Sequence, residues 1–132
     1  MELDTKQKIL VAIYTEYQKD LPYMSAVLSP NSIGFEPEIV RVALLKLEAE
    51  GYITGYRDSQ WNPGQPAVRC IDPHSYIMMT REGIDYVEQK LNIDPKASNR
   101  EKVETVAREG VRWGVDFIKD VAARALKDMM GI

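Results

Sequence analysis

Residues 33–55 read IGFEPEIVRVALLKLEAEGYITG, and this stretch decides the fold. Pro37 is well tolerated at the first position of a helix, and no helix breaker follows it before Gly51. Glycine is common just past the end of a helix, so the stretch predicts a helix over 37–50. The residues after Gly51 are mostly β-branched or aromatic, which predicts that the chain passes from this helix directly into a strand.

The segments that flank this stretch predict further helices. Asp4 and Gln7 have the spacing of a capping box, and apolar residues then recur at helical spacing, so an amphipathic helix is expected over 5–18. A short helical turn is expected to end at Gly34. Thr80 is the expected N-cap of a later helix, which places three apolar residues on one face: Ile84, Val87 and Leu91.

A β-hairpin is expected between the last two of these helices. YITGYR at 52–57 has the composition of a first strand, DSQWNPGQP at 58–66 that of a turn-forming tip, and AVRCI at 67–71 that of a second strand. SYIMM at 75–79 follows an Asp-Pro turn, and it either prolongs or rejoins the sheet.

This order of helix, short helix, helix, hairpin and helix is that of a winged helix, a helix-turn-helix variant whose hairpin forms the wing. We therefore predict an α+β fold that is mainly α: a winged helix-turn-helix domain followed by a long C-terminal helix. The predicted winged-helix domain spans 1–92, a polar linker with Pro95 spans 93–98, and an amphipathic C-terminal helix spans 99–132.

Three local sequences carry a resemblance to a known family: Ile33-Gly34, Leu44 to Gly55, and Thr80 to Val87. Together they resemble the YjcQ-like family of small winged-helix proteins over residues 5–92. The resemblance implies a winged-helix fold and supplies no catalytic residues. A winged helix followed by a long C-terminal helix is also similar, more distantly, to the PadR-type regulators, in which that helix makes a dimer.

The C-terminal segment predicts one long helix with a broad apolar face. Ser98 and Glu101 form a capping box, and apolar residues continue at helical spacing from Val103 to Met130, which predicts up to about 32 residues or roughly 48 Å. The apolar arc covers about 200°, more than one-sided packing requires, so this helix should touch two surfaces. Either a second copy or its own domain covers it. The residues expected at a homodimer interface are Val111, Trp113, Gly114, Phe117, Ile118, Val121 and Ala125.

Two functions are compatible with the helix at 37–50. Its core side should be Ile39, Val40, Ala43, Leu44 and Leu47. If the chain is a DNA-binding regulator, the phosphate and groove contacts should come from four cations: Arg41, Lys46, Arg57 and Arg69. If it is instead a protein-interaction module, an unidentified protein partner should contact four apolar residues: Val42, Leu45, Ala49 and Trp61.

The charge distribution argues against simple binding to DNA. Residues 1–94 hold nine Lys and Arg against fourteen Asp and Glu, a balance of −5, whereas residues 95–132 hold eight against six, a balance of +2. Affinity for DNA comes largely from cations that neutralise phosphates, and the predicted winged-helix domain has few of them.

Several classes of chemistry are not expected. His74 and Cys70 are the only residues of their kinds, so neither a disulfide within the chain nor a structural zinc site of four nitrogen and sulfur ligands can form. The glycines form no phosphate-binding motif. We expect no metal, no cofactor and no enzymatic activity. No run of 18 apolar residues spans a membrane, and no secretory signal opens the chain, so a cytoplasmic protein is expected.

Overall fold

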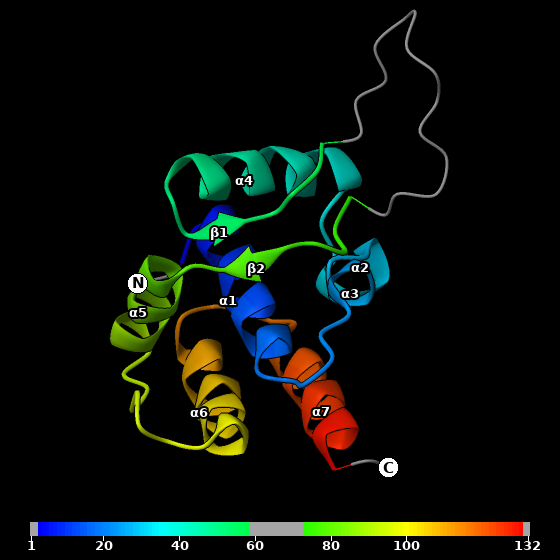
Figure 1. The fold of residues 1–132 in the computed structure, drawn as a ribbon. Coiled ribbons are helices and arrows are strands. Elements are labelled where there is room, and N and C mark those ends of the chain that lie inside the picture. The colour runs from blue at the N-terminus through cyan, green and yellow to red at the C-terminus, as the bar shows by residue number, and fades with distance from the viewer. Residues whose placement is uncertain (1–2, 59–72, 131–132) are drawn as a thin grey trace, which may run out of the picture.

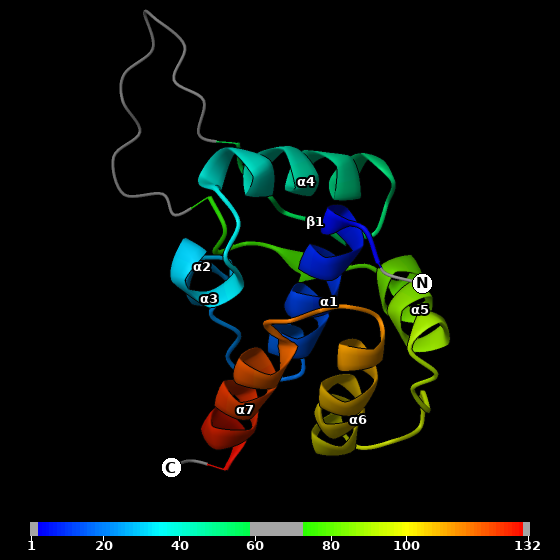
Figure 2. The same ribbon diagram turned by 180° about the vertical axis from the view of Figure 1, so that it is seen from behind.

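Helix α1 (Thr5–Tyr17) lies at the centre of the fold, with other helices above, below and beside it (Figures 1 and 2). The computed structural model describes residues 3–58 and 73–130. In these ranges the other elements are α2 (Met24–Val27), α3 (Pro30–Ile33), α4 (Pro37–Ala49), β1 (Ile53–Thr54), β2 (Met78–Met79), α5 (Arg81–Lys90), α6 (Asn99–Arg112) and α7 (Ile118–Met129). The fold is mainly helical with a small antiparallel sheet, as the α+β prediction requires.

Helix α1 begins at the predicted capping box. The Asp4 carboxylate accepts a hydrogen bond from the Gln7 backbone, and the Gln7 side chain accepts one from the Asp4 backbone. Every residue from Ile9 to Glu16 is buried. A helix covered on all sides has no solvent face, so the expected amphipathic character is weak even though the helix itself is confirmed.

The small sheet forms where α4 ends. The backbone at Gly51 has φ +83°, a left-handed conformation that glycine adopts without strain, and β1 follows it directly. Strand β2 lies in the SYIMM segment and pairs with β1 in antiparallel register, Ile53 with Met79 and Thr54 with Met78. SYIMM therefore rejoins the first strand, while the predicted second strand at 67–71 lies outside the described residues.

Helix α5 is held close to this sheet. Thr80 caps it as predicted, accepting a hydrogen bond from the Gly83 backbone, and its hydroxyl also donates to the Gly51 carbonyl at 2.5 Å. A Cβ at Gly83 would lie 2.1 Å from the Tyr52 carbonyl oxygen, so only glycine permits this approach. Val87 and Leu91 are buried on the predicted face.

The prediction of one continuous C-terminal helix is wrong. The chain turns back between α6 and α7, which lie side by side as a helical hairpin (Figures 1 and 2). Gly114 has φ +79°, and Val115 in the turn is fully buried. Helical periodicity alone does not distinguish one long helix from two antiparallel ones, because the apolar face is the same in both.

The hairpin is also not an appendage beyond a linker. Val106, Val115, Ile118 and Val121 belong to the same hydrophobic cluster as the buried residues of α1, and both α6 and α7 contact α1. Ile93, inside the predicted linker, is buried in that cluster as well. Residues 5–92 and the C-terminal hairpin therefore share one core.

A buried polar network joins α1, α5 and α6. The Tyr14 hydroxyl donates to Oε2 of Glu88 at 2.8 Å, and Nζ of Lys102 lies 2.9 Å from the same oxygen. Both Tyr14 and Glu88 are buried. Burial raises the pKa of Tyr14, and the hydrogen bond to Glu88 raises it further.

Replacing Tyr14 with Phe should cost about 1 to 2 kcal/mol of unfolding free energy at pH 7, because buried Glu88 loses a donor. The folded pKa of Tyr14 lies above its ordinary value of 10.0, so its contribution is complete below pH 10 and is lost as the pH rises further. Urea titrations between pH 7 and 11 should show a steeper alkaline fall for the native chain than for Tyr14→Phe. Parallel curves of unfolding free energy against pH for the native chain and Tyr14→Phe would contradict the buried hydrogen bond. Tyr23 is exposed, so Tyr23→Phe is the matched control.

Candidate functional site

The outer face of α4 carries exposed apolar side chains. Ile39, Val42 and Leu45 are 44%, 38% and 37% exposed, and Ala49 on the same side is also exposed. The outward direction of Val42, Leu45 and Ala49 is as predicted. We call Ile39, Val42, Leu45 and Ala49 the α4 face.

The prediction that Ile39 is a core residue is wrong. The buried row of α4 consists of Val40, Ala43, Leu44 and Leu47. On a helical wheel Ile39 stands about 90° from the centre of that row, at the boundary between the two faces. No described element covers it there, so it extends the exposed α4 face.

Arg41, predicted to contact nucleic acid, is engaged within the chain. Its guanidinium donates to both carboxylate oxygens of Asp58, at 2.8 and 2.9 Å, and to Glu38 at 2.9 Å. The hydrogen bonds to Asp58, more than those to Glu38, raise the pKa of Arg41. A phosphate would have to displace two carboxylates before it reached this cation.

Two of the other predicted nucleic-acid contacts lie on the exposed surface. Lys46 is exposed in the last turn of α4. Arg57 is exposed and stacks over the Tyr76 ring, with its guanidinium carbon 4.4 Å from the ring centroid. Arg69, like Trp61 of the predicted interaction face, lies outside the described residues.

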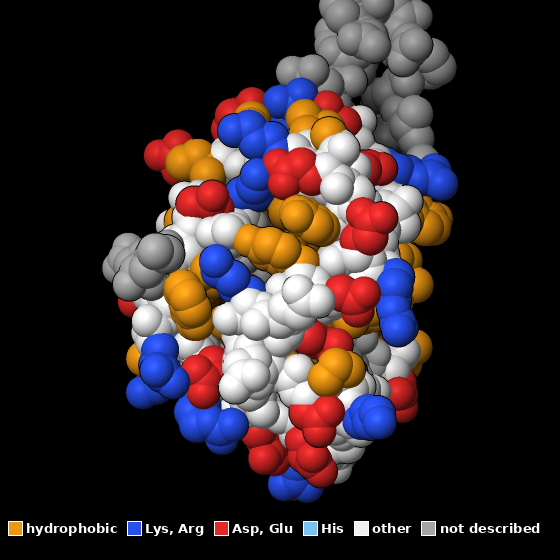
Figure 3. Space-filling model, turned by 90° about the vertical axis from the view of Figure 1, so that its left-hand side faces the viewer, with side chains coloured by type: hydrophobic (Ala, Val, Ile, Leu, Met, Phe, Trp, Pro, Cys, Tyr) orange, Lys and Arg blue, Asp and Glu red, His pale blue; other side chains and the backbone are white. Residues whose placement is uncertain are grey.

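Acidic side chains border the α4 face. Glu36 and Glu48 flank it, and Glu50 at its C-terminal end forms an ion pair with Lys6 of α1. Figure 3 views the molecule from the side of α5, where Lys and Arg side chains alternate with Asp and Glu and leave small apolar patches between them. On the face shown, the positive charges do not form the continuous stripe that a DNA-binding surface needs.

The residues predicted for a dimer interface are mostly covered within the chain. Ile118, Val121 and Ala125 are buried between α7 and its own neighbours. Trp113 is partly buried with Nζ of Lys90 over its ring, Phe117 makes an edge contact with Phe35, and Gly114 forms the turn. Val111 is 46% exposed. Packing on its own domain, one of the two possibilities left open, is therefore what covers most of this face.

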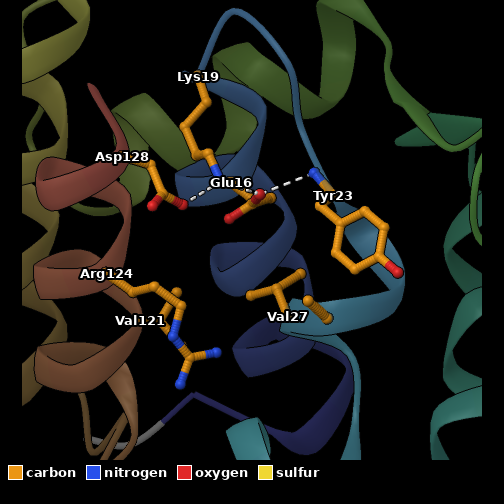
Figure 4. Close-up of a pocket in the computed structure, with 8 residues that line it drawn as sticks. Glu16, Lys19, Tyr23, Val27, Val121, Arg124 and Asp128 are labelled. Atoms are coloured by element: carbon orange, nitrogen blue, oxygen red, sulfur yellow. Dashed lines mark hydrogen bonds and ion pairs between the residues drawn. The ribbon is translucent and has the colours of Figure 1, made fainter. Parts of the chain in front are cut away.

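A small pocket of about 70 Å³ lies where α1, the start of α2 and α7 meet (Figure 4). Nζ of Lys19 lies 2.7 Å from Glu16 and 2.5 Å from Asp128, and Glu16 also accepts a hydrogen bond from the Tyr23 backbone. Burial lowers the pKa of Lys19, but the hydrogen bonds to Asp128 and Glu16 outweigh it and raise the pKa overall. The three charges therefore hold α7 against α1.

Neither charge cluster was found by sequence reasoning. Glu16 and Glu88 stand within or beside apolar positions of their helices, which is the one signal that marks them. Their partners Lys102 and Asp128 are distant in sequence, so only the fold brings them together. Among the described residues no cluster of His, Cys, Asp or Glu side chains could hold a metal ion, and His74 stacks on Tyr56.

Comparisons with known proteins provide no relative: no family model matches the chain, and neither does any curated protein sequence or solved structure. Within residues 3–58 and 73–130, every helix is too short or too polar to cross a membrane.

Replacing Lys19 with Met should lower the unfolding free energy by about 2 kcal/mol, because buried Glu16 loses its cation while Asp128 is released. Exposed Lys119→Met on α7 is the matched control and should change stability by less than about 0.5 kcal/mol. Urea denaturation at pH 7 measures both. Equal effects would show that the Lys19 cluster does not anchor α7.

Proposed function

We propose that this chain is a winged helix that serves as a protein-interaction module, with no enzymatic activity. The observation that carries the proposal is the α4 face, on which Ile39, Val42 and Leu45 stand in one exposed row. Full burial of a side chain of this size is worth roughly 1.5 to 3 kcal/mol, and since each is about 40% exposed, covering each one gains roughly 0.6 to 1.2 kcal/mol.

The order of elements supports the winged-helix part of the proposal. Helix α4 follows a short helix, leads directly into β1, and is packed on α1, so it has the position of the recognition helix in such domains. An apolar outer surface at that position favours contact with a protein over contact with base edges.

The charges around the α4 face indicate the chemistry of the partner. Glu36 and Glu48 border the face together with one exposed cation, Lys46, whereas Arg41 is already neutralised by Asp58 and Glu38, so the balance at the border is acidic. A partner that presents apolar side chains flanked by Lys or Arg complements both features. An amphipathic helix with a basic border is the simplest segment with that pattern.

DNA binding is the second candidate, as the function of a regulator. Exposed Lys46 and Arg57 favour it, since both are accessible for contact with phosphates. In this case the Arg41–Asp58 pair has to open before Arg41 takes part.

Replacing Leu45 with Glu tests the protein-interaction proposal. The variant places a charge in the centre of the α4 face, and we expect it to lose its partner proteins in quantitative affinity capture from the native host. Val111→Glu makes the same change on exposed α6 and should retain them. If both variants retain the same partners, the α4 face is not the binding surface.

Fluorescence anisotropy with a random-sequence DNA duplex tests the second candidate. If the described cations Lys46, Arg57 and Arg41 make the phosphate contacts, the logarithm of the binding constant should fall with the logarithm of salt concentration with a slope of about −2 to −3. Lys46→Ala and Arg57→Ala should each reduce that slope by about 1. DNA binding that Leu45→Glu abolishes while partner capture persists would favour the regulator over the interaction module.

A further inference from the structure

The helical hairpin of α6 and α7 is arranged symmetrically about its turn. Gly110 of α6 packs against Ile118 of α7, where a Cβ on the glycine would lie 2.9 Å from the isoleucine side chain. Val103 and Ala125 belong to one buried cluster further along the hairpin. In each pair the two residues stand at equal distances in sequence on either side of Gly114.

This symmetry has a geometric consequence. If α6, the turn and α7 straighten into one helix, two such helices can pair antiparallel with a two-fold axis near Gly114. Gly110 of one copy then faces Ile118 of the other, and Val103 faces Ala125, so the contacts of the hairpin are remade between chains. Glycines at 110 and 114 permit the close approach of two helices at that axis.

The turn is close to a helical conformation at its C-terminal end, where Phe117 has φ −79° and ψ −6°. Straightening rotates Trp113, which has φ −97° and ψ 11°, and Gly114, which holds a left-handed φ of +79°. The apolar spacing continues through the turn without a proline, so the sequence is compatible with a continuous helix from α6 to α7.

The surface that α7 occupies is equally available to α7 of a second copy. It consists of α6 and of the end of α1, where Lys19 pairs with Asp128 and the Val121 side chain is buried. A second copy brings the same Asp128 and Val121 to the same place. Exchange of an identical element between subunits is a low-cost route to a dimer, because the new interface reuses the contacts of the closed chain.

We propose that the α7 surface accepts α7 of a second copy of this chain, which gives a domain-swapped dimer with a straight α6–α7 helix in each subunit. Straightening breaks contacts that hold the turn in the closed monomer. Among them are the edge contact of Phe117 with Phe35 and the hydrogen bond from the Leu3 backbone N–H to the Trp113 carbonyl. The closed monomer is therefore the form at low concentration, and the swapped dimer forms as concentration rises.

Asp116→Pro is the decisive variant. Ile118 N–H donates to the Val115 carbonyl at 3.1 Å, and Phe117 has the dihedral angles of the third residue of a type I turn. Asp116 is therefore the second residue of that turn, the position that proline favours. Inside a continuous helix the same proline is strongly unfavourable, so the closed monomer is retained while the dimer dissociation constant should rise at least a hundredfold.

Asp116→Ala is the matched control, because alanine is accepted in the turn and in a helix. Sedimentation equilibrium from 10 to 500 µM should show a dimer fraction that rises with concentration for the native chain and for Asp116→Ala, and a monomer throughout for Asp116→Pro. A dimer of unchanged affinity in Asp116→Pro would overturn the proposal, because that dimer would not need a straight helix.

Gly114→Ala tests the opposite direction and does not depend on how the proline variant folds. Alanine disfavours the left-handed φ of the turn and favours a helix, so the dimer dissociation constant should fall at least tenfold. A native chain and a Gly114→Ala variant that both stay monomeric at 500 µM would overturn the proposal. The result is independent of the proposed function, because none of these residues belongs to the α4 face.

Discussion

The structure depends on the burial of α1 from Ile9 to Glu16. A helix covered on all sides cannot leave its polar groups to water, so each of them needs a partner within the protein. The Thr15 hydroxyl donates to the Val11 carbonyl, and the Gln18 side chain donates to the Tyr14 carbonyl, so these two are satisfied inside the helix. Tyr14 instead reaches Glu88 of α5, and Glu16 pairs with Lys19 and the Tyr23 backbone just beyond the end of α1.

These two side chains determine how the surrounding helices are attached. Tyr14 meets Glu88 of α5, which in turn meets Lys102 of α6. Glu16 meets Lys19, which meets Asp128 of α7. A buried charge that loses its partner is costly, so each pairing favours one position of the outer helix over neighbouring ones. The C-terminal hairpin is thus specified by polar contacts as well as by apolar packing.

The elements near residues 33–55 could be predicted because their signals are local. Pro37, Gly51 and Thr80 act on the backbone next to them, and α4 and α5 begin or end where these residues indicate. The turn at 113–117 also carries a local signal, since Gly114 holds a left-handed φ just past α6 and the Val115 N–H donates to the Gly110 carbonyl, as in a helix that ends at a glycine. It was missed because the apolar spacing continues through the turn, and the packing of Ile118 on Gly110 that favours the reversal is tertiary. Ile39 was misplaced for a tertiary reason, since its exposure depends on which neighbouring elements cover α4.

The candidate site was predicted in part. Val42, Leu45 and Ala49 follow from helical spacing, which is a property of the helix alone. The ion pair between Arg41 and Asp58 could not be predicted from helical spacing. Asp58 lies beyond β1 and reaches α4 only after the chain has turned. A list of cations in a sequence therefore overstates the charge that is available to a phosphate.

The two proposed surfaces lie on opposite sides of α1. Helix α4 lies at one end of the molecule and α6 and α7 at the other, so the C-terminal hairpin does not cover the α4 face (Figures 1 and 2). Exchange of α7 between two copies leaves both α4 faces accessible. A dimer then offers two equal binding sites in one particle, and a partner with two matching segments binds it more tightly than it binds either site alone. Through this arrangement the concentration of the chain itself would control the avidity of its α4 face.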